Sequence, residues 1–177
     1  MFKAILSYGL IAGLIAGVLL SATTIGMAGN PPQHGLLLGY TTMLVALSAV
    51  FVGIKRYRDN DLGGVIGFWL AFGMGVAMSF IAGILYVVAW EAAVAVTHMD
   101  FAGTYSAVLI EQQKSKGVSG AELARFVAEM ERFKVQYADP LFRLPMVFIE
   151  IFPVGVLVSL VSAGLLRNSR ILPARRG

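Results

Sequence analysis

The sequence predicts an all-helical, polytopic membrane protein with four transmembrane helices and an amphipathic helical hairpin between the third and fourth. Hydrophobic residues make up 58% of the 177 residues, and charged residues only 14%. The mean hydropathy of +0.78 is typical of membrane proteins and excludes ordinary soluble domains. Four apolar stretches are each long enough for a bilayer, which takes roughly 20 residues of helix. The length leaves room for a single membrane domain, residues 1–177.

The four expected spans cover about residues 4–27, 35–54, 64–96 and 144–166. Backbone amides in lipid must be bonded within their own segment, so each stretch is interpreted as a helix. The third is longer than a bilayer requires and must tilt or extend beyond the surface. The first begins near Lys3, like a signal peptide. Its apolar stretch, however, exceeds the roughly 7–15 residues of a typical signal, so we expect an uncleaved helix.

The positions of lysine and arginine predict the orientation. They gather after the second span and in the tail, at Lys55, Arg56, Arg58, Arg167, Arg170, Arg175 and Arg176. The connection between the first two spans, residues 28–34, has none. By the positive-inside rule, both termini and the second loop lie in the cytoplasm, and the insert is extracytoplasmic. The net charge of +4 then indicates contact with anionic lipid, not with nucleic acid.

Small residues recur every four positions on three of the spans. The series are Gly9, Gly13 and Gly17; Gly67, Ala71, Gly75, Ser79 and Gly83; and Gly155, Ser159 and Ala163. This spacing places them on one helix face, where a second helix approaches closely. We expect packing inside the bundle with the third helix at its centre, and the alternative is a homodimer seam.

The insert, about residues 97–143, has the pattern of a helical hairpin. Gly117 breaks it into two helices, and Pro140 ends the second. Ser119 and Glu122 have the spacing of a capping box at the start of the second helix. Apolar residues then fall on one face and charged residues on the other. The hairpin either caps the bundle, lies at the membrane interface or docks an external partner.

Glu91 and Glu150 are the charged residues well inside the spans. Each lies about six residues from the outer end of its helix, so we expect both at a similar depth, roughly 8–9 Å below that end. Carboxylates in hydrocarbon usually face a cavity or a partner, and two close together can share a proton. With His98 they form a candidate outward-facing polar pocket for a proton, a cation or a cationic solute. The alternative is two interfacial carboxylates that reach headgroup water.

Other chemistry has little support in the sequence. The chain has no cysteine, which excludes disulfides, thiolate metal sites and cysteine nucleophiles. His34 and His98 lack the spacing of a zinc or haem site. Ser79, Ser159 and Ser162 have no histidine in the same helical stretch to activate them. We therefore predict no enzymatic activity, no metal and no cofactor.

Several short motifs point to one family. They are Tyr8-Gly9, Gly53 to Asn60, Gly63-Gly64, Ala71-Phe72 and Glu150-x-x-Pro153-x-Gly155. Through them the chain resembles, over nearly its whole length, the small bacterial membrane proteins grouped as a domain of unknown function, DUF4199. The resemblance implies a four-helix inner-membrane protein with a helical insert, and it directs attention to the second loop.

The second loop is a candidate docking site for a cytoplasmic partner or an anionic lipid. Its residues are Lys55, Arg56, Tyr57, Arg58 and Asp59. The alternative is that they only anchor the topology and contact lipid phosphate at headgroup level.

Together these observations favour a non-enzymatic accessory or scaffold subunit. Its partners would be membrane lipids and other membrane proteins, or a second copy in a homo-oligomer. The alternative is a small-solute or ion transporter that uses the acidic pocket at Glu91 and Glu150. Four helices make a small carrier, however, and neither an inverted repeat nor a mid-membrane helix break is visible.

Overall fold

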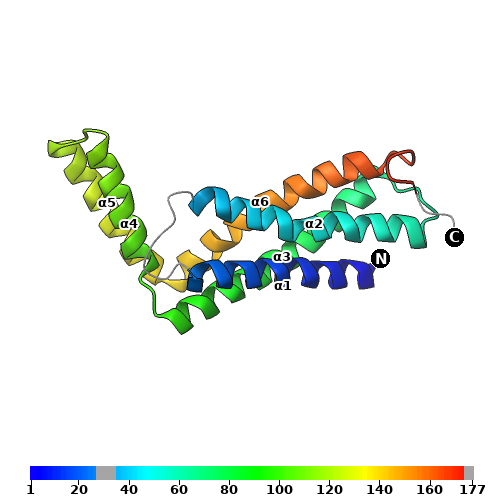
Figure 1. Ribbon diagram of the computed structural model, residues 1–177, viewed down its shortest axis with the longest axis horizontal. Coiled ribbons are helices and arrows are strands. Elements are labelled where there is room, and N and C mark those ends of the chain that lie inside the picture. The colour runs from blue at the N-terminus through cyan, green and yellow to red at the C-terminus, as the bar shows by residue number, and fades with distance from the viewer. Residues whose placement is uncertain (27–34, 174–177) are drawn as a thin grey trace. The chain divides into compact units, whose positions relative to one another are not determined.

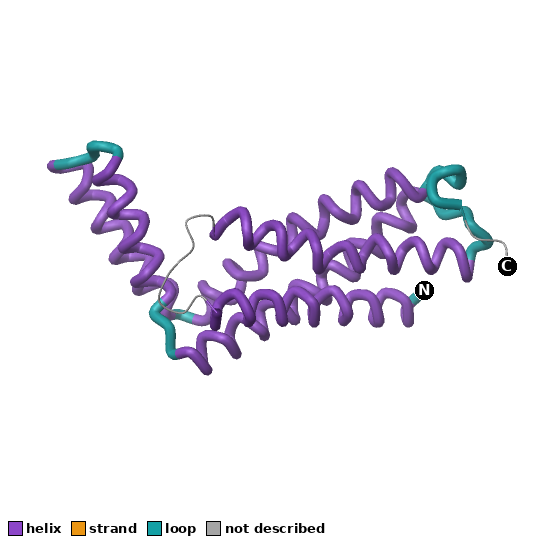
Figure 2. The backbone as a smooth tube through the Cα atoms, viewed as in Figure 1, coloured by secondary structure: helices purple, strands orange, loops and turns teal. Residues whose placement is uncertain are grey.

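The computed structural model describes residues 1–26 and 35–173. Within these ranges the chain forms helices and no strands, as Figure 2 shows. The helices are α1 (Phe2–Gly26), α2 (Gly35–Asp61), α3 (Phe68–Thr97), α4 (Phe101–Ser115), α5 (Gly120–Ala138) and α6 (Pro140–Leu166). The predicted all-helical fold class is confirmed.

Four of these helices are long and apolar enough to cross a membrane. The candidate spans are Phe2–Thr24, Leu37–Asp61, Phe68–Thr97 and Pro140–Leu166. Each agrees with one of the predicted stretches, and the chain is an integral membrane protein.

Three helix ends differ from the prediction. The third spanning helix begins at Phe68 and not at residue 64, because Gly63 and Gly64 form the preceding turn. Gly67 of the predicted small-residue series therefore lies outside the helix.

The second helix continues past residue 54 to Asp61, because lysine and arginine are good helix formers. The fourth spanning helix begins at Pro140 and not near residue 144. Proline is favoured in a first helical turn, and the Leu141 amide donates to Asp139 Oδ1 at 2.9 Å, which caps the helix.

The chain divides into two compact units. One comprises Met1–Ala93 and Val147–Gly177, and we call it the span body. The other comprises Val94–Met146, and we call it the hairpin unit. Figure 1 labels the helices of both.

In the span body, α1 and α3 run parallel and meet through the glycines of α1 (Figure 1). A methyl group on Gly9 would lie 2.9 Å from Ile81 Cβ, one on Gly13 would lie 2.6 Å from Leu85 Cδ1, and one on Gly17 would lie 2.9 Å from Ala89 Cβ. Such distances leave no room for a side chain. The backbones therefore approach closely, as the four-residue spacing predicts.

The same helix α3 meets α6 through a reciprocal pair of small residues. A methyl group on Gly75 would lie 2.7 Å from Ser159 Cβ, and one on Gly155 would lie 2.6 Å from Ser79 Cβ. The two serine hydroxyls are 3.3 Å apart, and Ser159 Oγ donates to the Gly155 carbonyl at 2.7 Å. Helix α3 therefore contacts both α1 and α6 through the small residues that the sequence pattern identified.

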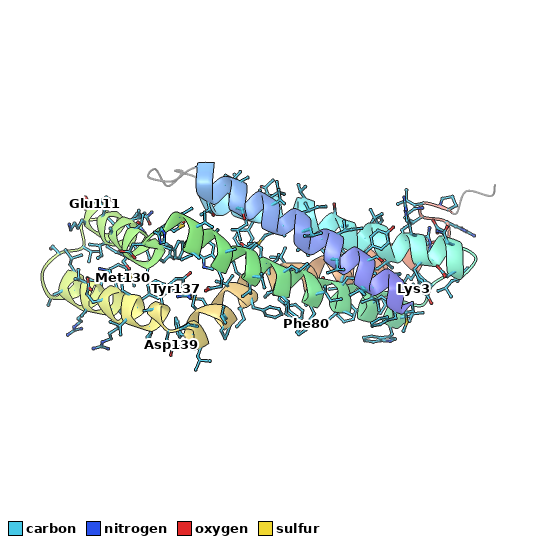
Figure 3. The ribbon with its side chains drawn as sticks, turned by 90° about the horizontal axis from the view of Figure 1, so that it is seen from below. Lys3, Phe80, Glu111, Met130, Tyr137 and Asp139 are labelled. Carbon is cyan, nitrogen blue, oxygen red and sulfur yellow. The ribbon has the colours of Figure 1, made fainter. Side chains whose placement is uncertain are left out.

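The hairpin unit is held together by aromatic rings. Phe101 and Tyr105 of α4 lie beside Phe133 and Tyr137 of α5, with ring centroids 5.4 to 6.0 Å apart across the two helices. Figure 3 shows Tyr137 together with Met130 on α5. Phe133 takes part in this cluster although the sequence pattern did not single it out.

The turn between α4 and α5 confirms the predicted break at Gly117. Gly117 has φ +84°, and its amide donates to the Lys114 carbonyl while the Val118 amide donates to the Gln113 carbonyl. This is a Schellman motif, which favours glycine at that position. Ser119 occupies the cap position of α5, but its side chain forms no cap hydrogen bond, so the predicted capping box is absent.

Candidate functional site

The five residues of the proposed docking loop lie on a helix. Lys55 to Asp59 form the penultimate turns of α2. Arg58 is completely buried, Lys55 and Tyr57 are half-buried, and Arg56 is exposed. The segment therefore has an inward and an outward side, and its cations do not form one surface.

Arg58 is the only buried charged residue in the described part of the chain. Its Nε donates to Asp59 Oδ1 at 2.7 Å. Its Nη atoms donate to the carbonyl of Leu166, the last residue of α6, at 3.4 Å, and to those of Ile171 at 3.1 Å and Leu172 at 2.5 Å in the segment after it. A guanidinium has five N–H donors and no acceptor, so this ring of oxygens suits it.

The buried guanidinium is compensated in two ways. Asp59 supplies the opposite charge and also pairs with Lys55 Nζ at 2.5 Å. The Leu166 carbonyl lies at the negative end of the α6 dipole, which favours a cation. Arg58 thus joins the end of α2 to the segment after α6, a structural task that leaves it unable to contact a partner in solution.

Two glycines shape the turn that follows. Gly63 and Gly64 have φ values of +63° and +92°, a region that L side chains rarely adopt. Their turn brings the Gly64 amide to the Arg58 carbonyl at 2.9 Å. The chain reversal between α2 and α3 requires positive φ values, and this explains why two consecutive glycines stand at positions 63 and 64.

The two carboxylates of the predicted pocket lie at different depths. The contacts of Gly75 with Ser159, and of Gly83 with the Phe148 ring, place Glu150 level with about residues 81–84 of α3. Glu91 is seven to ten residues farther along α3, which amounts to roughly 10–15 Å at about 1.5 Å per residue. The expected similar depth is therefore wrong, since it assumed that both helices end at the same level.

The surroundings of the two carboxylates also differ. Glu91 is half-buried, whereas Glu150 is exposed on the surface of α6. At their separation they do not share a proton, because that requires carboxyl groups in contact.

His98 belongs to the hairpin unit, and its backbone is its most distinctive feature. It has φ +50°, and its amide donates to the Val94 carbonyl at 2.9 Å, so it ends α3 in the left-handed conformation. Histidine is among the residues that tolerate this conformation better than most. His34 lies outside the described residues. Within the described ranges no three His, Cys, Asp or Glu side chains gather as metal ligands would.

The hydroxyls of the span body bond mainly to their own helix. Ser162 Oγ donates to the Val158 carbonyl at 2.6 Å, four residues earlier, as Ser159 does to Gly155. A serine hydroxyl bonded in this way has its hydrogen-bond donor satisfied within its own helix. The small side chain then allows the helix to pack closely against its neighbour.

A family profile described as a protein of unknown function, DUF4199, matches residues 7–168. The match covers most of the chain, which therefore belongs to this family. Two of its motif residues pack on each other, since a methyl group on Gly53 would lie 2.6 Å from the Tyr8 ring. No curated protein and no solved structure matches the chain.

Proposed function

We propose that this member of the DUF4199 family is a non-enzymatic accessory or scaffold subunit that binds another membrane protein through helix α5. The observation that carries the proposal is a second apolar strip on α5, separate from the face that packs on α4. Its members are all small or β-branched and all exposed: Ala121, Ala124, Ala128 and Val135.

The strip has the geometry of a helix-docking surface. Its spacing of three, four and seven residues returns to the same side of a helix, as in the core positions of a coiled coil, with the exposed Glu131 at the core position between Ala128 and Val135. The packed face of α5 uses the same spacing at Phe126, Met130 and Phe133. Alanine at such positions permits a close approach of a partner helix, and Val135, 76% exposed, would then be covered.

Charged residues flank the strip and favour a protein partner over lipid. Arg125, Glu129 and Arg132 are exposed on the neighbouring face of α5. They carry both signs, so they would select a partner and its orientation more than they would attract an anionic membrane.

The proposal includes an orientation in a bacterial inner membrane. Arg56, Arg167 and Arg170 are exposed at the end of the span body where α2 and α6 finish. The positive-inside rule places that end in the cytoplasm. The hairpin unit, inserted between the third and fourth spans, would then meet its partner on the opposite side.

The competing proposal is a transporter that uses Glu91 and Glu150. The offset between their levels weakens it, because a shared binding pocket needs both groups at one depth. Reconstituted flux of protons or cations through Glu91→Gln and Glu150→Gln variants tests it directly. Loss of a measurable flux in both variants would favour transport, and absence of flux in the unaltered protein would remove the alternative.

The experiment for the scaffold proposal is affinity purification from native membranes in mild detergent, with mass spectrometry of the bound proteins. Val135→Arg places a charge in the strip, and Gln136→Arg places the same charge on the adjacent, charged face of α5. We expect the first to abolish a stoichiometric partner and the second to retain it. Equal recovery with both variants would show that the strip is not the docking surface.

A further inference from the structure

An apolar groove runs along the outside of the span body between α1 and α3. Its volume is about 630 Å³, within the range of roughly 300–1,000 Å³ common for ligand pockets. Its lining is formed mainly by Phe2, Ile5, Phe72, Gly73, Ala77 and Phe80. Figure 3 shows Phe80 on α3 and Lys3 at the start of α1.

The groove has the length of one membrane leaflet. Its lining on α3 extends from Phe72 to Ile81, which corresponds to about 14 Å at about 1.5 Å per residue. Half of a hydrocarbon core about 30 Å thick is about 15 Å. An acyl chain that enters at the helix ends therefore has room to lie along the groove.

Gly73 forms an open floor to the groove. No heavy atom lies within 4 Å of the position that its Cβ would occupy. This glycine differs from Gly9 and Gly13 of α1, whose space is filled by α3. Among the described residues none packs on Gly73, so the space above it is open to another molecule.

Aromatic side chains form the wall of the groove at its mouth. Phe68 stacks on Phe72 with centroids 6.0 Å apart, and Trp69 meets Phe72 edge-on at 6.4 Å. Trp69 is 79% exposed at the first turn of α3. Tryptophan at the end of a spanning helix is typical of the headgroup level, which places the mouth there.

The mouth of the groove is electropositive. Lys3 is exposed and forms no ion pair with any described residue. Since α1 and α3 run parallel, their amino-terminal ends lie at the same end of the bundle, with α3 beginning about six residues, or about 9 Å, before the level of Phe2. The Lys3 side chain can extend toward the surface across this step, so the lysine and the positive end of the α3 dipole favour an anion at the end of the groove.

We propose that the groove binds an anionic phospholipid, with one acyl chain over Gly73 and the phosphate group beside Lys3. The apolar lining requires hydrocarbon, and the electropositive mouth requires an anion at headgroup level. A partner helix would satisfy the first requirement and not the second. This inference is independent of the docking strip on α5.

The first test fills the groove without altering the fold. Gly73→Leu and Gly164→Leu are matched, because both glycines are exposed in α3 and α6 with no atom within 4 Å of a new Cβ. The protein is purified with a mixture of palmitoyl-oleoyl phosphatidylglycerol and phosphatidylcholine, and bound lipid is counted by native mass spectrometry. We expect Gly73→Leu to lose the bound phosphatidylglycerol and Gly164→Leu to keep it.

The second test removes the charge. Lys3→Gln should lower the preference for phosphatidylglycerol over phosphatidylcholine by about fivefold, the effect of one basic residue near an anionic surface. Lys114→Gln, an exposed lysine of the hairpin unit, is the control and should leave it unchanged. Equal binding of both lipids by the unaltered protein would overturn the proposal. An unchanged number of bound lipids in Gly73→Leu would also overturn it. The same holds if this variant loses only its self-association and keeps the bound lipid.

Discussion

In the span body α3 meets α1 and α6 at small residues, and it also meets α6 through the rings of Phe80, Phe148 and Phe152. The two helices of the hairpin unit meet mainly through rings. At Gly13 and Gly75, atoms of a neighbouring helix lie directly against the glycine backbone. Across α4 and α5, the contact is made instead by Phe101 on Tyr137 and by Tyr105 on Phe133. The two regions belong to one chain and are both helical, yet the share of the contact made by large rings differs between them.

The difference follows from what each surface gains by burial. In lipid, an apolar side chain gains little by leaving the solvent, so helices associate through close packing and backbone approach. In water, burying a large ring is favourable in itself. The hairpin unit also carries exposed ion pairs, Lys114 with Glu111 and Lys134 with Glu131, which are costly away from water or headgroups.

The largest expected effect tests the buried cation of the span body. Arg58→Leu removes the donor to three carbonyls and leaves Asp59 with Lys55 alone, so the free energy of unfolding should fall by about 3–5 kcal/mol. Thermal unfolding in detergent measures it. Arg56→Leu, two residues earlier and exposed, is the control, with a change within about 0.5 kcal/mol. Similar losses in both variants would contradict the role assigned to Arg58.

The next effect tests the close approach of helices. Gly13→Leu forces a side chain into Leu85 and Ala82, so we expect a loss of about 1–3 kcal/mol or more. Gly39→Leu introduces the same side chain into α2 where no atom lies within 4 Å. If the control destabilises the protein as much as Gly13→Leu does, then helix propensity and not packing decides the result.

A smaller effect tests the rings of the hairpin unit. Tyr137→Leu keeps an apolar side chain but removes the contacts with two phenylalanines and with Arg143, whose guanidinium lies 5.8 Å from the ring centroid. The expected loss is about 0.5–1.5 kcal/mol. Near-ultraviolet circular dichroism during thermal unfolding reports it. Tyr40→Leu, at an exposed position of α2, should leave the transition unchanged.

The last comparison concerns the two helix caps of the hairpin unit, and the smallest expected change is at Ser119. Asp100 Oδ1 accepts from the Gly103 amide at 2.8 Å, so Asp100→Ala should cost about 0.5–2 kcal/mol. Ser119 makes no such bond, and Ser119→Ala should therefore change stability by no more than about 0.3 kcal/mol. A larger loss at Ser119 than at Asp100 would show that the capping box forms in solution.

The parts of the fold that follow from periodicity were predictable from the sequence. The spans, the helical insert and the glycine faces are repeated patterns, and repetition outweighs any single residue. The ends of the helices were harder. Asp139 and Pro140 were expected to end one helix, but they also begin the next. An aspartate followed by a proline is compatible with the end of one helix and with the cap and first turn of another.

The candidate site was less predictable because its residues depend on register and on distant partners. The relative levels of Glu91 and Glu150 depend on the register in which α3 packs against α6, and no local sequence pattern specifies that register. Arg58 resembles any cation of a positive-inside cluster until its acceptors, more than a hundred residues later, are known. One signal was present in the sequence: the aspartate directly after it, which offers a buried guanidinium its counter-charge.

The bond between Arg58 and the last turn of α6 has a consequence for how the protein is made. The ribosome produces α2 long before the carbonyls of Leu166, Ile171 and Leu172 exist, since 108 residues separate Arg58 from the first of them. During that interval the guanidinium must stay hydrated or borrow a temporary partner. The end of α2 can therefore reach its final state only after the fourth span has been made, and a chain that stops before residue 171 would leave Arg58 with Asp59 and the Leu166 carbonyl alone.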